Sequence, residues 1–163
     1  MDAKVIVRPA SSNDVEALAQ LHVSTWRETY SELVPKSFFS EKVVDHRRRM
    51  WAEWIQDRES DRVIRVAEIN GTVEGFAAAG AAMSDPAPRA RELYMIYVAK
   101  SWHGSGAGQS LLDAVLGEQS AFLWVAKQNP RAHAFYTRNG FKPDGGEQVD
   151  PRAEKLVEVR LVR

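Results

Sequence analysis

The chain has 163 residues, 44% of them hydrophobic, and this composition is sufficient for the core of one domain, which we expect to span residues 1–163. Its 22 Lys and Arg balance its 22 Asp and Glu, so nothing in the net charge favours nucleic acid as a partner. The absence of cysteine excludes disulfides, zinc–thiolate sites and cysteine nucleophiles.

The sequence gives no indication of a membrane or metal partner. No apolar run approaches the roughly 18–20 residues that a membrane span needs. Residues 1–4 lack the apolar core of an export signal, so we expect a cytoplasmic location. The histidines at positions 22, 46 and 133 have no ligand-like spacing, and no metal is predicted.

The first third of the chain predicts one strand and two helices. Residues 5–8 alternate and end at Pro9, which favours a short strand. Asn13 and Glu16 are expected to cap a helix whose apolar face continues to Tyr30, with Pro35 as its stop. A second helix is expected after Ser40, with a buried stripe formed by Val43, Val44, Met50, Trp51, Trp54 and Ile55.

The middle of the chain predicts three strands and a helix. Residues 62–69 and 72–82 are strand-like and are joined by Asn70-Gly71, a strong hairpin signal. The small side chains of residues 75–82 indicate that another backbone or a ligand approaches closely. After an irregular loop at 84–89, residues 92–98 predict a buried strand. A glycine-rich turn follows at 103–108, and then a helix at 109–116 that stops at Gly117.

The last third predicts a strand at 121–126 and a helix that begins at Pro130, a residue favoured at the first helical position. This helix is expected to stop at Asn139-Gly140. Residues 154–162 alternate as a closing strand, and residues 144–152 are predicted to be a polar loop from their composition. The predicted order, β-α-α-β-β-β-α-β-α-β-β, is that of a mixed α/β domain.

The glycine-rich turn has the features of an anion site. A strand, the three glycines Gly104, Gly106 and Gly108, and a helix in succession expose backbone N–H groups at the positive end of a helix dipole. The turn lacks the Gly-Lys-Ser/Thr ending of a nucleoside triphosphate loop. It also lacks an acidic residue about 20 positions later that would bind the ribose of a dinucleotide. Taken alone, the turn favours a flexible loop that binds nothing.

Two motifs together resemble those of the GNAT superfamily of N-acetyltransferases. Residues 103–108 match its loop pattern Gln/Arg-x-x-Gly-x-Gly/Ala at all positions but the first, which here is His103. Residues 129–141 match Asn-x-x-Ala-x-x-Phe-Tyr-x-x-x-Gly-Phe at every fixed position. The strand at 93–98 and the opening Arg8-Pro9-Ala10 are also family-like. The resemblance spans nearly the whole chain. It implies the GNAT fold, a mixed, mostly antiparallel sheet with splayed middle strands and about four flanking helices.

The resemblance also implies acetyl-CoA as cosubstrate and a set of residues that bind it. The backbone of the central strand would hold the pantetheine arm, and one of its N–H groups would polarise the thioester carbonyl. The loop would hold the pyrophosphate mainly through backbone N–H groups, so His103 should preserve binding with less charge assistance. Asn129 would contact the pantetheine arm and also cap a helix. These residues are Ile96, Tyr97, Val98, His103, Gly104, Ser105, Gly106, Ala107, Gly108 and Asn129.

Two residues match catalytic positions of the family. Tyr136 corresponds to the tyrosine that acts as general acid on the leaving thiolate; the alternative is a half-buried core aromatic. Glu92, eleven residues before His103, corresponds to the glutamate base of the histone-modifying branch. A carboxylate in a narrow site has a raised pKa that suits this work. The alternative for Glu92 is a solvated charge at the start of a strand.

The acceptor is expected to be a primary amine of a small molecule or of a protein or peptide. Residues 22–30 resemble the corresponding region of small-amine acetyltransferases, including those that act on polyamines. Trp26 and Tyr30 would contact the amine by cation–π attraction, and Trp124 would narrow the pocket; core packing is the alternative for all three. Residues 47–49, three arginines, are expected on a solvated helix face.

The resemblance therefore implies direct acetyl transfer without a covalent intermediate. The alternative is a CoA-binding sensor or interaction module without turnover. Whether the chain forms a homodimer is left open.

Overall fold

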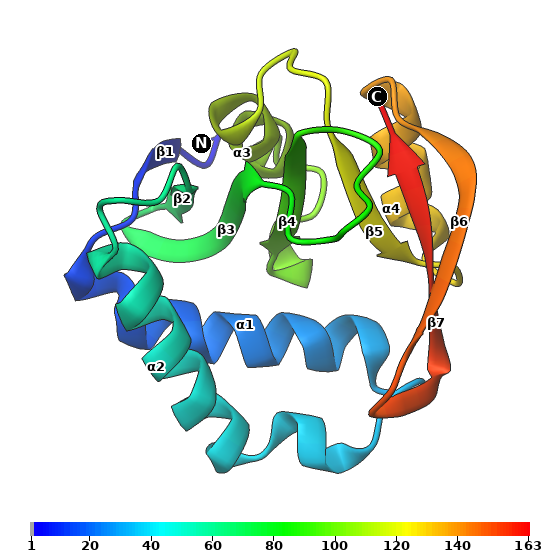
Figure 1. Cartoon of the computed structure of the whole chain (residues 1–163). Helices are drawn as coiled ribbons and strands as arrows, with labels where there is room; N and C mark the ends of the chain where they lie inside the picture. The colour runs from blue at the N-terminus through cyan, green and yellow to red at the C-terminus, as the bar shows by residue number, and fades with distance from the viewer. Residues whose placement is uncertain (1) are drawn as a thin grey trace.

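The computed structural model describes residues 2–163, and its helices and strands follow the predicted order (Figure 1). Three short 3-10 turns lie at Ser12–Asp14 (η1), Lys36–Phe39 (η2) and Lys100–Trp102 (η3). The main elements are β1 (Val5–Pro9), α1 (Val15–Tyr30), α2 (Glu41–Gln56), β2 (Val63–Ile69), β3 (Thr72–Ala81), β4 (Arg91–Val98), α3 (Ala107–Val115), β5 (Phe122–Ala126), α4 (Pro130–Arg138), β6 (Lys142–Asp150) and β7 (Ala153–Val162).

The strands form one seven-stranded sheet in the order β1-β2-β3-β4-β5-β7-β6. Within the described residues, β4 and β5 are the parallel pair and the other neighbours are antiparallel. A parallel pair needs a crossover, which α3 provides. Asn70 and Gly71 both have positive φ, 51° and 85°, as expected for the β2–β3 hairpin turn. The predicted mixed, mostly antiparallel sheet is confirmed.

Two pairs of helices cover the two faces of the sheet (Figure 1). On one face, Leu18 of α1 and Trp51 of α2 pack against Phe76 of β3. On the other face, Leu111 of α3 and Tyr136 of α4 pack in a second cluster that includes side chains of β2 to β5 and β7. Because strand side chains alternate, the position of a residue in a strand decides whether it faces α1 or α3.

The small residues of β3 are explained by neighbours within the chain. A Cβ on Gly75 would lie 3.1 Å from the carbonyl oxygen of Tyr97 and 3.2 Å from Leu111 of α3. A Cβ on Gly80 would lie 2.5 Å from the hydroxyl of Tyr94. The predicted close approach is therefore made by the backbone of β4 and by packed side chains.

The predicted start and stop of the first helix are both displaced. Ser11 and Asp14 form the capping pair in place of Asn13 and Glu16, and this pair lies at the start of η1: the Asp14 carboxylate accepts the N–H of Ser11 at 2.8 Å. Arg8 of β1 fixes this carboxylate through two hydrogen bonds of 2.8 and 2.9 Å. The helix ends at Tyr30, before Pro35, and the main chain continues into η2. Arg8, in the strand just before the cap, fixes the carboxylate of Asp14, and capping patterns do not include such an ion pair.

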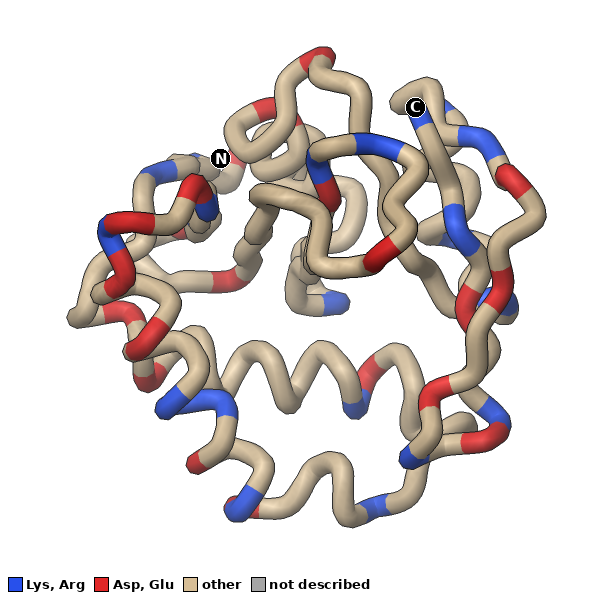
Figure 2. Tube along the Cα trace, viewed as in Figure 1, with Lys and Arg blue, Asp and Glu red and all other residues tan. Residues whose placement is uncertain are grey.

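The prediction of a polar loop at 144–152 is wrong, because most of this stretch belongs to β6. The strand pairs with β7 along its length, with an irregularity between Pro143 and Glu147. β6 is an edge strand whose side chains are mostly exposed, so it needs no apolar alternation to form its backbone hydrogen bonds. Charges of both signs are interspersed over the chain (Figure 2), as the zero net charge suggests.

Candidate active site

The two central strands separate after a short paired stretch. β4 and β5 are in register only at Glu92–Phe122 and Leu93–Leu123. At Tyr94 the pairing of β4 with β3 shifts by one residue, a bulge of the kind that redirects a strand. The splay implied by the resemblance is therefore present. A cleft of about 540 Å³ opens there and is lined by residues of β4, β5, α1, α4 and the glycine-rich loop.

The edge of β4 offers backbone groups to this cleft. The N–H of Ala99 donates to the carbonyl of Glu74 on the β3 side at 2.8 Å. Because backbone N–H and C=O groups alternate along an antiparallel strand, those of Tyr97 also face β3, whereas those of Ile96 and Val98 face the cleft. Tyr97 lines the cleft with its side chain. Nε2 of His103 donates to the carbonyl of Val98 at 3.0 Å and ties the loop to the strand.

The glycine-rich loop has the backbone shape that its sequence predicts. Gly104 and Gly106 have φ of 82° and 87°, in the left-handed region that favours glycine. A Cβ on either residue would meet no atom within 4 Å, so backbone conformation and open space at the cleft account for these glycines. Gly106 immediately precedes α3, and the hydroxyl of Ser105 accepts the N–H of Ala107 at 3.3 Å. Gly104, Gly106 and Gly108 line the cleft at the start of α3, where the backbone N–H groups of a helix favour an anion.

Helix α4 places Tyr136 in the cleft. Asn129 caps this helix by accepting the N–H of Ala132 at 3.2 Å, and Pro130 occupies the first helical position as predicted. Two turns later the ring of Tyr136 packs edge-on against Phe135 and Phe141. Burial raises the pKa of the Tyr136 hydroxyl well above its ordinary value, and the charge of ionised Tyr30 adds to this effect. The hydroxyl therefore carries its proton at neutral pH.

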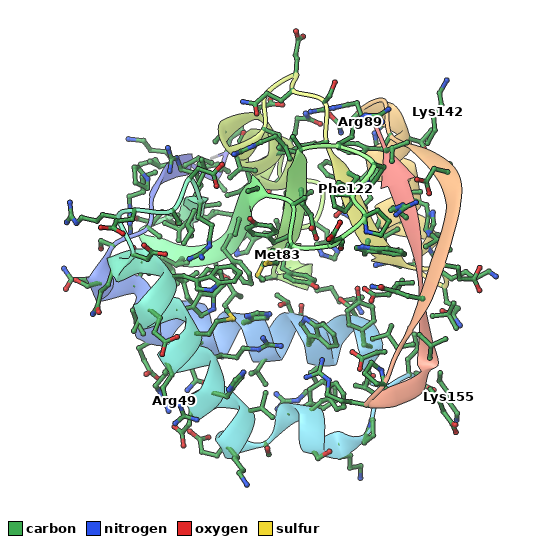
Figure 3. All side chains as sticks on the ribbon, viewed as in Figure 1. Arg49, Met83, Arg89, Phe122, Lys142 and Lys155 are labelled. Atoms are coloured by element: carbon green, nitrogen blue, oxygen red, sulfur yellow. The ribbon has the colours of Figure 1, made fainter. Side chains whose placement is uncertain are left out.

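Glu92 lies at the closed end of the splay and outside the cleft lining. It is only 6% exposed, and its carboxylate accepts the N–H of Met83 at 2.9 Å (Figure 3 labels Met83). Burial raises the pKa of Glu92, while hydrogen bonds from the backbone of Met83 and Ser84 lower it. The alternative of a solvated charge does not hold for this residue.

Two of the three expected acceptor residues line the cleft. Tyr30 lines it from α1, and Trp124 lines it from β5 as the first residue beyond the last β4–β5 pair. Trp26 lies behind Tyr30, with ring centroids 4.7 Å apart, and stacks on Phe38. The indole N–H groups of Trp26 and Trp124 are buried and have no hydrogen-bond partner in residues 2–163.

Several lining residues were not singled out from the sequence. Thr25 and Thr29 of α1 and Arg131 and Arg138 of α4 belong to the cleft wall. The two arginines are seven positions apart, and this spacing places them on the same face of a helix. That spacing is the feature of the sequence from which their shared position in the cleft could have been predicted. No group of three or more potential metal ligands occurs among residues 2–163. Over the same residues, no helix combines the length and apolar character of a membrane span.

Comparison with known proteins gives consistent matches. A model of the acetyltransferase (GNAT) family matches residues 16–141. YuaI, an uncharacterised N-acetyltransferase of Bacillus subtilis (strain 168), is 33% identical over 132 residues, which cover 77% of this chain and 74% of that protein.

Among solved structures, PaiA N-acetyltransferase from Thermoplasma acidophilum, in complex with coenzyme A, has a TM-score of 0.73 at 19% identity, covering 96% of this chain and 98% of that one. A ribosomal-protein-alanine N-acetyltransferase from Brucella melitensis has a TM-score of 0.71 at 22% identity, covering 97% and 98%. At these identities the two structures share the fold.

Proposed function

Because this chain belongs to the acetyltransferase (GNAT) family, we propose that it transfers the acetyl group of acetyl-CoA to a primary amine by direct attack, without a covalent enzyme intermediate. The observation that carries the proposal is the splay of β4 and β5. It brings the free edge of β4, the glycine-rich loop and Tyr136 to one cleft. We also propose that residues 1–163 act as one acetyltransferase domain, since the seven strands form a single sheet.

In this proposal the pantetheine arm lies along the cleft-facing backbone of Ile96 and Val98, with Asn129 beside it. The pyrophosphate lies on the loop 103–108, at the start of α3. Its donors are the N–H groups of Gly104, Gly106 and Gly108, because those of the other three residues of the loop already donate within the chain. Arg131 and Arg138, which line the cleft, add positive charge near a cofactor that carries several phosphates. One N–H of the β4 edge donates to the thioester carbonyl as its oxygen becomes negative.

The proposed reaction needs two proton movements. The amine nitrogen attacks the thioester carbon to form a tetrahedral intermediate. Its collapse completes the amide and breaks the carbon–sulfur bond. Tyr136 gives its hydroxyl proton to the departing sulfur. The proton lost by the amine goes to Glu92, and we propose that it travels through water, because Glu92 lies outside the cleft wall and accepts the N–H of Met83.

The acceptor enters from the face of the sheet that α1 covers. Tyr30 and Trp124 contact it directly in this arrangement, and Trp26 supports Tyr30 from behind. The aromatic rings suit the alkyl part of an amine and its cationic form before deprotonation.

A thiol-release assay with acetyl-CoA and a panel of primary amines tests the proposal. Release of CoA that depends on one class of amine, with formation of the acetylated product by mass spectrometry, is the expected result. Gly106→Glu is the matched negative control, because its side chain projects from the loop that holds the pyrophosphate. Tight CoA binding without turnover for any amine would favour the alternative, a CoA-binding module.

A further inference from the structure

Arg47 occupies an inward position on α2. Val44, Arg47 and Trp51 are three and four residues apart and therefore share one helix face. Val44 and Trp51 on this face are buried, and Arg47 is half-buried. The expectation of a solvated face for residues 47–49, the blue stretch in the middle of α2 in Figure 2, is correct for Arg49 and wrong for Arg47. Arg49 lies on the outer side of the helix (Figure 3).

The guanidinium of Arg47 has no anionic partner within residues 2–163. Its only hydrogen-bond partner is the thioether of Met50, at 3.7 Å. Several other half-buried arginines have oxygen partners: Arg8, Arg91 and Arg160 each pair with an aspartate at 2.8 Å, and Arg163 donates to backbone carbonyls. A cation removed from water without a counterion is unfavourable, and burial accordingly lowers the pKa of Arg47.

Arg47 is not part of the cleft lining, but side chains packed between α2, α1 and β4 connect it to the cleft. One turn along α2, the ring of Trp51 is 5.7 Å from that of His22, which is 5.9 Å from that of Tyr97, a residue that lines the cleft. Burial is the main cause of the lowered pKa of His22, and the charge of Arg47 adds to it; burial also lowers the pKa of Arg47, and Tyr97 opposes that shift. Arg47 is therefore a neighbour of the side chains between α1 and the splayed strands.

The charged groups around this region already have partners. The carboxylate of Glu28 accepts the N–H of Lys100, and that of Glu158 accepts from Gln148. Arg152, at the turn between β6 and β7, pairs with Asp150 at 3.0 Å. Among these groups Arg47 is the cation without an oxygen partner. No Asp or Glu belongs to the described cleft wall, although Glu158 lies close enough to Tyr30 and Tyr97 to add to the rise that burial causes in the pKa of both.

We propose that Arg47 binds an oxyanion carried by the acceptor, so that the substrate is an amine that also bears a carboxylate or a phosphate. This inference rests on the proposed function and names the substrate class of the same site. The planar guanidinium presents paired donors that match the oxygens of either group. The attacking amine then lies toward Tyr30 and Trp124, and the anionic end lies toward α2.

Matched acceptors and variants test this assignment. The panel contains amino acids, their amides, the corresponding decarboxylated amines, phosphoethanolamine and spermidine. The two anionic groups distinguish carboxylate from phosphate. In Arg47→Met we expect kcat/KM for the preferred anionic amine to fall about 10- to 100-fold, mainly through KM, as for loss of hydrogen bonds to a charged group. Neutral amines should change less than about 3-fold, and Arg47→Lys should restore part of the loss.

Arg49→Met is the control, because it removes the same charge from an exposed position of the same helix. Wild-type preference for the neutral amine or for spermidine, or equal effects of Arg47→Met and Arg49→Met, would overturn the assignment. If no amine supports CoA release, the proposed function itself fails, and the substrate class fails with it.

The stability of the free protein provides a readout independent of turnover. An unpaired, half-buried cation that is retained for ligand binding should be destabilising, so Arg47→Met should raise the thermal midpoint while Arg49→Met leaves it unchanged. A lower midpoint in Arg47→Met would show that Arg47 supports the fold, and would overturn its assignment to the acceptor.

Discussion

Alanine at Gly106 is the sharpest test of the glycine-rich loop, because the structure separates its effect on the fold from its effect on the ligand. Gly106 has φ of 87°, and an added Cβ would meet no atom within 4 Å. The cost to the free protein is therefore conformational, about 1–2 kcal/mol for an L-residue in the left-handed region. We expect the free energy of unfolding to fall by that amount, measured by urea denaturation.

The effect on the cofactor should be larger than this strain. An alanine relieves the strain by rotating φ, which turns the N–H groups at the start of α3 away from the pyrophosphate. Loss of one hydrogen bond to a charged group costs about 1.5–3 kcal/mol, so the Kd for CoA should rise about 10- to 100-fold by calorimetry.

Gly71→Ala is the matched control for Gly106→Ala. Gly71 has φ of 85°, and an added Cβ would meet no atom within 4 Å, but it lies in the β2–β3 turn and does not line the cleft. Alanine there should also cost about 1–2 kcal/mol of unfolding free energy and leave the Kd within about 3-fold. Unchanged affinity in Gly106→Ala, or equal losses in both variants, would refute the placement of the pyrophosphate on this loop.

Three further predictions concern catalysis, capping and acid stability. Tyr136→Phe should lower kcat by about 10²-fold or less with little change in KM for acetyl-CoA, because only the acid is lost; an unchanged kcat would remove Tyr136 from the mechanism. Asn129→Ala should cost about 1 kcal/mol of unfolding free energy through loss of the α4 cap. Asn129→Asp should keep that stability, and weaker CoA binding in both variants would support a contact with the pantetheine arm. Arg8 lowers the pKa of Asp14 below its ordinary value of 3.8. The unfolded chain therefore binds the proton more readily, and the stability that the pair contributes above pH 4 is lost as the pH falls through this range. In Arg8→Met the free energy of unfolding should fall less steeply between pH 6 and pH 2 than in the wild type. An unchanged dependence on pH would contradict the role given to the Arg8–Asp14 pair.

Local patterns predicted most of the fold because they depend on neighbours in the sequence. The Asn70-Gly71 turn, the proline start of α4 and the glycines of the loop all reflect backbone preferences that a few adjacent residues determine. Predictions failed where pairing between elements, and not the local residue pattern, decided the outcome. Asp14 forms the capping pair with Ser11 while Arg8 of β1 holds its carboxylate, and residues 144–150 became a strand because β7 supplies the hydrogen bonds.

For the candidate site, the sequence by itself determined which functional groups are present: a glycine-rich phosphate loop, a tyrosine on a capped helix and a strand before them. It also determined the family that carries these motifs. Only the tertiary structure decided which of these groups share a cleft. The single-residue shift at Tyr94 and the short β4–β5 register open that cleft, turn Ile96 and Val98 toward it and leave Glu92 outside its wall. Arg47 illustrates the same division, since the sequence shows three equal arginines, and packing against α1 and the sheet turns the first inward without a counterion. The physical reason is that backbone conformation is set over a few residues, whereas burial and pairing of a charge depend on elements that are distant in the chain.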